Sequence, residues 1–388
     1  MNTITTAIHG GARRDDSFGA INEPIYMTSN YRIPTDGTPV DWSGINSNIY
    51  ARNRNPNQMV LQDKLCAMTG AEDGAVFASG VAALAAVFVT FLNSGDHAVV
   101  SEVCYSATNL LFRKYLPEKF RIEVTFVDTT DTGAVRAAVR ENTKLIHIET
   151  PGNPTTGITD IDAVAEIAHA AGALLSVDAT FAGPACIRTL DHGADLEVHS
   201  MTKYINGHGD ALGGCVLGSA ELIAQVKEIA MVNFGGILSP FNAWLIARGL
   251  VTAPLRMQQH SRTAQAVAEF LEASPSVRFV RYPGLESHPQ HALAASLMGG
   301  QYSGMIAFAF DADEDTHRRF LDALRLVTHA VSLGDVESLI VYYDRASDKL
   351  PHYPAIFQDG FYRFSIGLED AEDLIADLKQ AMEIVGLA

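Results

Sequence analysis

Cysteine and basic residues are both scarce in this chain. Its four cysteines, Cys66, Cys104, Cys186 and Cys215, have no C-x-x-C or zinc-like spacing, so we expect reduced thiols in a cytoplasmic protein and no metal site. The 28 lysines and arginines are outnumbered by 45 aspartates and glutamates, which gives a net charge of −17. A charge of this sign repels nucleic acid and anionic membrane surfaces, so we expect neither as a partner.

Several sequence signals are also missing. The first sixteen residues contain Arg13 and Arg14 but no apolar stretch after them, so no secretory signal is expected. No G-x-G-x-x-G fingerprint, repeat or low-complexity tract occurs, and this disfavours a dinucleotide-binding protein. The uncharged run from Ala75 to Leu92 is long enough to span a membrane, but Ser79-Gly80 interrupts it. A buried strand, a tight turn and a buried helix fit it better, with Gly80 and Val81 at a helix N-terminus that favours a phosphate.

Short apolar segments alternate with helical stretches between about residues 74 and 217. We expect strands at 96–101, 124–127, 145–149, 174–178 and 196–199. This alternation predicts an α/β fold with a mostly parallel sheet covered by helices on both faces. Residues 240–270 are expected to form one or two long helices. Strands at 305–310 and 361–366, with helices around 314–326 and 370–386, predict a smaller α+β C-terminal domain.

The most informative segment runs from Ser200 to Asp210. Lys203 follows Ser200 and Thr202 there and precedes two glycines, shortly after a predicted strand. A lysine in this setting can form an imine with a phosphate-bearing cofactor while the two hydroxyls hold the phosphate. Asp178 ends another predicted strand and offers the carboxylate that a protonated pyridine nitrogen requires. A solvated strand end and a turn aspartate are the plain alternatives, but together these residues predict a pyridoxal 5'-phosphate (PLP) site.

Further segments of the chain resemble the Cys/Met-metabolism PLP enzymes, a family that includes cystathionine γ-synthase, cystathionine lyases and methionine γ-lyase. The matching segments lie at 23–29, 50–56, 79–83, 149–154, 200–210, 239–244, 332–339 and 363–370. The resemblance implies fold type I, with a seven-stranded sheet, and a homotetramer built from dimers that share their active sites. It also implies an N-terminal arm over residues 1–60 that reaches a neighbouring subunit, a PLP-binding domain over 61–250 and a C-terminal domain over 251–388.

The resemblance also assigns roles to individual residues. Lys203 is expected to carry the cofactor and to take the α-proton, and Tyr105 to stack on the ring and assist the leaving group. The expected cofactor ligands are Lys203, Asp178, Ser200, Thr202, Gly80, Val81, Tyr105 and Asn153, together with Tyr50 and Arg52 from another subunit. Arg363, Ser332 and Asn153 are expected to bind the substrate, with the Arg363 guanidinium on its carboxylate.

Plainer interpretations of four of these residues stay open. Tyr105 could be an ordinary buried tyrosine, Asn153 a turn residue, Arg363 part of a surface salt bridge, and Arg52 part of a solvated loop.

The expected activity is γ-elimination from an L-amino acid with a heteroatom leaving group at Cγ, as in methionine γ-lyase. Methionine γ-lyases typically have a cysteine where this chain has Ala107, whereas Gly209 is shared with them. The segment from Ile340 to Leu350 departs from the family pattern where the distal part of the substrate should lie. Its Asp344 and Asp348 could favour a cationic tail such as that of canavanine, or they could be surface charges.

Three alternatives to elimination remain. One is γ-replacement of the cystathionine γ-synthase or O-acylhomoserine sulfhydrylase type, one is an aminotransferase, and one is a cofactor-binding partner protein without turnover.

Overall fold

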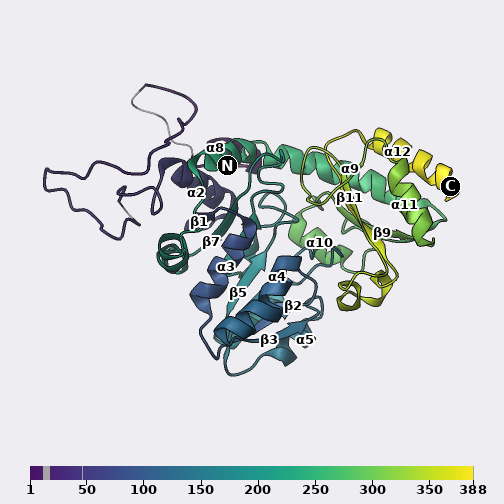
Figure 1. Cartoon of the computed structure of the whole chain (residues 1–388), viewed down its shortest axis with the longest axis horizontal. Coiled ribbons are helices and arrows are strands. Elements are labelled where there is room, and N and C mark those ends of the chain that lie inside the picture. The colour runs from purple at the N-terminus through teal and green to yellow at the C-terminus, as the bar shows by residue number, and fades with distance from the viewer. Residues whose placement is uncertain (12–17, 46, 388) are drawn as a thin grey trace.

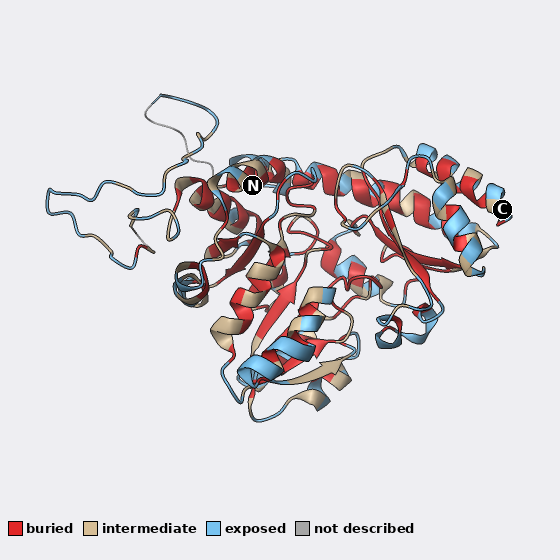
Figure 2. Cartoon of the chain, in the orientation of Figure 1, coloured by how far each residue is buried: buried red, intermediate tan, exposed pale blue. Residues whose placement is uncertain are grey.

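The computed structural model describes residues 1–11, 18–45 and 47–387. Two sheets lie side by side, with the long helix α9 (Ala253–Ala273) running along the C-terminal one (Figure 1). The irregular segment of residues 18–45 projects away from this body (Figure 1). The central strands of both sheets are mostly buried, whereas the edge strands Glu123–Val127 and Thr328–His329 have no buried residue. The described residues 18–45 of the projecting segment are largely exposed (Figure 2).

The larger sheet has seven strands within the described residues, in the order β1-β7-β6-β5-β4-β2-β3. β7 runs antiparallel to both of its neighbours and the other pairings are parallel, so the predicted fold is confirmed. The strands are β1 (Asp73–Phe77), β2 (His97–Ser101), β3 (Glu123–Val127), β4 (Thr143–Glu149), β5 (Leu174–Asp178), β6 (Leu196–Ser200) and β7 (Gly214–Gly218).

Alternation along the central strands places apolar side chains on both faces of this sheet. Val99 packs in one core with the helix α6 (Ile161–Ala170), whereas its neighbours Ala98 and Val100 pack in a second core with α3 (Gly80–Phe91). The remaining helical segments up to residue 250 are α1 (Thr3–His9), α2 (Pro56–Thr69), α4 (Ser106–Leu110), the π-helical η1 (Leu111–Phe120), α5 (Thr132–Ala138), the 3₁₀ turn η2 (Thr189–His192), α7 (Ala220–Val226), the π-helical η3 (Lys227–Asn233) and α8 (Pro240–Leu250).

The uncharged run 75–92 forms the end of β1, a turn and α3, as predicted. The turn is fixed by Ser79, whose side-chain hydroxyl accepts a hydrogen bond from the Ala82 amide at 3.1 Å and caps the helix. Within the described residues, no helix is long and apolar enough to cross a membrane.

The smaller sheet has the order β10-β11-β12-β9-β8 and is antiparallel except where β10 meets β11. The helices α9 and α12 pack on it around Phe308, Tyr362 and Phe364, which supports the expected α+β character. Its elements are β8 (Val277–Arg281), α10 (His291–Met298), β9 (Met305–Phe310), α11 (Glu314–Ala323), β10 (Thr328–His329), β11 (Leu339–Tyr343), the 3₁₀ turns η4 (Leu350–His352) and η5 (Ala355–Phe357), β12 (Phe361–Ser365) and α12 (Ala371–Val385). The domain boundaries at residues 60 and 250 stay predictions.

Candidate active site

A cavity of about 480 Å³ lies where the parallel strands of the larger sheet end and the C-terminal region begins. Side chains that follow β4, β5 and β6 meet there, as this architecture predicts. Residues from β11 and β12 close the opposite wall. Ten of the twelve residues expected at the site line this cavity, namely Gly80, Val81, Tyr105, Asn153, Asp178, Ser200, Thr202, Lys203, Ser332 and Arg363.

Lys203 lies in the turn that follows β6, with most of its side chain withdrawn from solvent. Its Nζ donates a hydrogen bond to the Ser332 hydroxyl at 2.7 Å. Burial and then the neighbouring Arg363 guanidinium lower the pKa of Lys203 to about 8, against an opposing effect of Asp335. A substantial fraction of this amine is therefore neutral near physiological pH, as a nucleophile or base must be.

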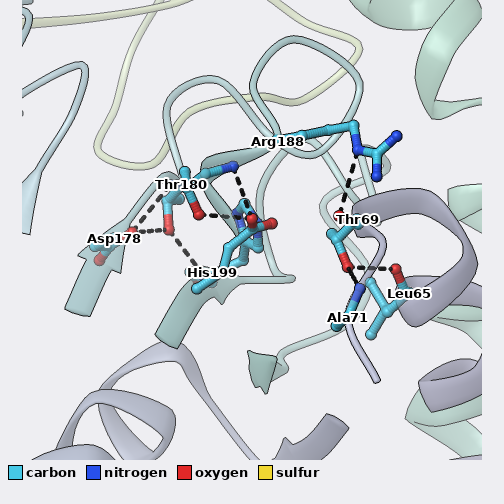
Figure 3. Close-up of polar contacts among 10 residues, drawn as sticks. Leu65, Thr69, Ala71, Asp178, Thr180, Arg188 and His199 are labelled. Atoms are coloured by element: carbon cyan, nitrogen blue, oxygen red, sulfur yellow. Dashed lines mark hydrogen bonds and ion pairs between the residues drawn. The ribbon is translucent and has the colours of Figure 1, made fainter. Parts of the chain in front are cut away.

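Asp178 ends β5, and its carboxylate is held by Thr180 two residues later (Figure 3). The amide and the hydroxyl of Thr180 both donate to Oδ1 of Asp178, at 2.9 and 2.5 Å. The same hydroxyl accepts the Ser200 amide at 2.8 Å and so links the ends of β5 and β6. Burial raises the pKa of Asp178, and the Thr180 hydrogen bonds oppose this. A pyridinium nitrogen beside the carboxylate would favour its ionised form.

The end of α3 offers a cradle for a phosphate. Gly80 begins this helix so close to Ser200 that an added Cβ would lie 2.6 Å from the Ser200 Cβ. Only glycine keeps the backbone here close to the Ser200 side chain. The backbone amides of Gly80 and Val81 and the Ser200 hydroxyl therefore reach one space. The Thr202 hydroxyl also lines this space and is hydrogen-bonded to the backbone of Gly213. The donors of this cradle fit the phosphate of PLP.

Arg363 is a buried cation on β12, only 7% exposed. It donates from Nη1 to the Asn153 Oδ1 at 3.3 Å and from Nη2 to the Ser332 carbonyl at 2.8 Å. Its Nε has no partner, and no carboxylate pairs with it among the described residues. A surface salt bridge is thus the wrong interpretation, because the guanidinium faces a cavity and lacks an anion.

Tyr105 precedes α4 and is 41% exposed, so it is not an ordinary core tyrosine. Asn153 is buried and its side chain is engaged by Arg363, which a plain turn residue would not require.

Tyr50 and Arg52 are the two expected residues that do not line the cavity. They lie together shortly before α2, with the Arg52 guanidinium 5.3 Å from the centre of the Tyr50 ring. Tyr50 is half exposed in the single chain. Their contribution to a neighbouring subunit stays a prediction.

The segment 340–350 borders the cavity only in part. Tyr343 and Lys349 line it, whereas Asp344 and Asp348 are exposed and do not. Asp344 accepts the Ala346 amide at 2.9 Å within its own turn. The surface-charge interpretation of the two aspartates fits this placement better than contact with a cationic tail.

Sequence reasoning missed three residues that organise the site. Thr180 holds Asp178, and Glu149 accepts two backbone amides beside the cavity. Arg256 is buried and donates to the carbonyls of Tyr204 and Ile205, which follow Lys203. Glu149 stood within a recognised motif at a strand end, but no sequence signal pointed to Arg256, which lies about fifty positions away.

Comparisons with known proteins agree with this geometry. Residues 4–383 match the model of the Cys/Met metabolism PLP-dependent enzymes. The chain is 54% identical over 383 residues to a canavanine gamma-lyase of Rhizobium leguminosarum bv. trifolii, covering 98% of this chain and 96% of the relative. It is 49% identical to the canavanine gamma-lyase of Pseudomonas canavaninivorans, covering 99% and 96% of the two chains.

A solved structure of similar fold is the cystathionine gamma-lyase of Lactobacillus plantarum complexed with L-serine. It superposes with a TM-score of 0.91 at 34% identity and covers both chains completely. The expected fold type, PLP cofactor and carbon–heteroatom lyase chemistry are confirmed by these matches. The chain therefore belongs to the family of Cys/Met metabolism PLP-dependent enzymes.

Proposed function

We propose that this protein is a PLP-dependent γ-lyase whose substrate is canavanine or a closely related amino acid with an oxygen-linked group at Cγ. The observation that carries the proposal is the meeting of Lys203, Asp178 and Arg363 in one cavity of a chain that is 54% identical to a canavanine gamma-lyase. The sequence left methionine-like and canavanine-like substrates open, and the similarity favours the second. The resemblance further suggests a cytoplasmic homotetramer.

The residues of the cavity divide the work. PLP, when bound, supplies a ring that accepts negative charge from the substrate Cα. Asp178 would keep the ring nitrogen protonated, while the Gly80 and Val81 amides with Ser200 and Thr202 would hold the phosphate. The Asn153 side chain would face the phenolic oxygen of PLP.

Other residues of the cavity would bind the substrate and transfer protons. Arg363 would bind the substrate carboxylate through its unpaired donors and so orient the Cα–H bond toward Lys203. The neutral Lys203 amine would take the α-proton, helped by its pKa of about 8. The Tyr105 hydroxyl would supply a proton to the oxygen that departs from Cγ.

The test is a substrate panel with purified holoenzyme. Canavanine, methionine, cystathionine and an acylhomoserine are compared by kcat/KM, with product identification. We expect canavanine to be preferred, and Lys203→Ala to abolish turnover. Borohydride treatment should leave the cofactor mass on the peptide that contains Lys203. A preference for an acylhomoserine plus a thiol would replace this proposal with γ-replacement.

A further inference from the structure

Glu149 ends β4 and buries its carboxyl group, which is 4% exposed, next to Asp178 on the neighbouring strand. Its two oxygens have different partners. Oε2 accepts the backbone amide of Tyr105 at 2.7 Å, and Oε1 accepts the backbone amide of Asn153 at 2.8 Å. One carboxyl group thus joins two loops, one that follows β2 and one that follows β4.

Neither amide has another acceptor within the described residues. The Tyr105 amide precedes α4, outside the intrahelical hydrogen bonds, and Asn153 is buried. Loss of the carboxylate would leave both donors without a protein partner, which proteins rarely tolerate in buried positions.

Each of the two loops carries a side chain that is expected to act at the active site. The Tyr105 side chain lines the cavity, and the Asn153 side chain accepts a hydrogen bond from Arg363 at 3.3 Å. A shift of the Asn153 loop would therefore also move the partner of the substrate-binding cation. The pKa of Glu149 is raised well above its usual value, first by burial and then by the adjacent Asp178, and the two amide hydrogen bonds oppose this rise.

We propose that Glu149 is a positioning residue that sets the distance between the Tyr105 loop and the Asn153–Arg363 pair. The functional consequence rests on the proposed function, because it assumes the roles of Tyr105 and Arg363. The clamp itself does not depend on the identity of the substrate.

Glu149→Gln is the sharpest variant, since it keeps the size of the side chain. A glutamine offers one oxygen and one NH₂ group, so one of the two amides would face a donor instead of an acceptor. We expect kcat/KM to fall about ten- to a hundredfold, with kcat and KM both affected. Cofactor attachment to Lys203 should be retained.

Asp377→Asn is the matched control. Asp377 is also a buried carboxylate, 4% exposed, and accepts the backbone amides of Arg325, Leu326 and Val327 at 2.9–3.2 Å. It lies in α12 and does not line the cavity. This variant should lower Tm while the kcat/KM of the folded enzyme stays unchanged.

Hydrogen–deuterium exchange of the holoenzyme provides a readout that is independent of activity. In the wild type, the Tyr105 and Asn153 amides should be protected, and Glu149→Gln should speed exchange in peptides spanning 102–110 or 150–157. Asp377→Asn should speed exchange only around 325–327. If Glu149→Gln proves insoluble, exchange in the wild-type enzyme still tests the inference. Rapid exchange of both the Tyr105 and the Asn153 amides would show that Glu149 does not hold them.

Two results separate this inference from the proposed function. An enzyme that prefers another substrate but shows the exchange pattern keeps the clamp and loses only the substrate proposal. The inference would be overturned if Glu149→Gln lowered Tm as Asp377→Asn does but left kcat/KM and the exchange rates of both loops at their wild-type values.

Discussion

The Ser332 hydroxyl accepts a hydrogen bond from the Lys203 ammonium group at 2.7 Å. The backbone carbonyl of the same serine accepts one from Arg363 at 2.8 Å. The backbone of Ser332 has φ +89°, a conformation that residues other than glycine rarely adopt. The residue that joins the two cations of the site is therefore held in a strained backbone conformation by its surroundings.

Substitutions of Ser332 should separate the hydroxyl from the strain. Ser332→Ala and Ser332→Gly both remove the acceptor of Lys203, so each should lower kcat/KM about tenfold, as expected for one hydrogen bond. Glycine also relieves the positive φ, so Ser332→Gly should be more stable than Ser332→Ala by roughly 1 kcal/mol. Thermal unfolding and steady-state kinetics measure the two effects. Equal activity of Ser332→Ala and wild type would show that the hydroxyl plays no part.

The pH dependence of cofactor attachment should report the shifted pKa of Lys203. Only the neutral amine attacks an aldehyde, and the pKa of this lysine is lowered to about 8 from 10.5. Because the pKa is lowered, the neutral fraction is larger at every pH below 10.5 than for an ordinary lysine. The rate of PLP attachment to the apoenzyme should therefore rise with pH around a midpoint near 8.

Arg363→Gln supplies the control for this measurement. The Arg363 charge is the second cause of the shift, after burial, so its removal should move the midpoint upward. A wild-type midpoint close to that of a free lysine would contradict the burial of the amine. A midpoint that Arg363→Gln leaves unchanged would assign the whole shift to burial.

A shared active site predicts complementation between inactive variants. Lys203→Ala lacks the cofactor lysine, and Arg52→Ala lacks the cation proposed to reach a neighbour's phosphate. Mixed dimers would contain one site with both wild-type residues, so activity should return to at most about half per dimer. The same mixture of Lys203→Ala with Asp178→Asn should stay inactive, because both of those residues line the cavity of one chain. Failure of the first mixture after demonstrated subunit exchange would assign Arg52 to its own chain or to the surface.

The sequence is most informative about reactive side chains that lie at or just after the end of a strand. Asp178 and Lys203 were placed correctly because strand ends in a parallel sheet share one edge, and Gly80 because its apolar run required a turn. The clamp by Glu149 was not predictable, since it depends on two loop amides that lie four and forty-four positions away. The strain at Ser332 and the Arg256 contacts likewise depend on tertiary packing, which leaves no periodic signal in the sequence.

The segment 340–350 provides a test of substrate charge, because its aspartates lie outside the cavity and its Lys349 lines it. Asp344 and Asp348 are exposed outside the cavity, where screened charges contribute little, so Asp344→Asn with Asp348→Asn should change kcat/KM for canavanine by less than about twofold. Lys349 lines the cavity and would repel a cationic group, so Lys349→Met should lower KM for canavanine.

The improvement should be at most about fivefold, since Lys349 is itself exposed and an exposed charge contributes roughly 0.2–1 kcal/mol. The kinetic constants for methionine, whose side chain is uncharged, should be the same in both variants as in the wild type. If Lys349→Met changes KM equally for canavanine and methionine, the effect comes from packing and not from charge. A tenfold rise of KM for canavanine in the double aspartate variant would mean that this segment folds over the cavity when substrate binds, because the carboxylates could then reach the guanidinium group.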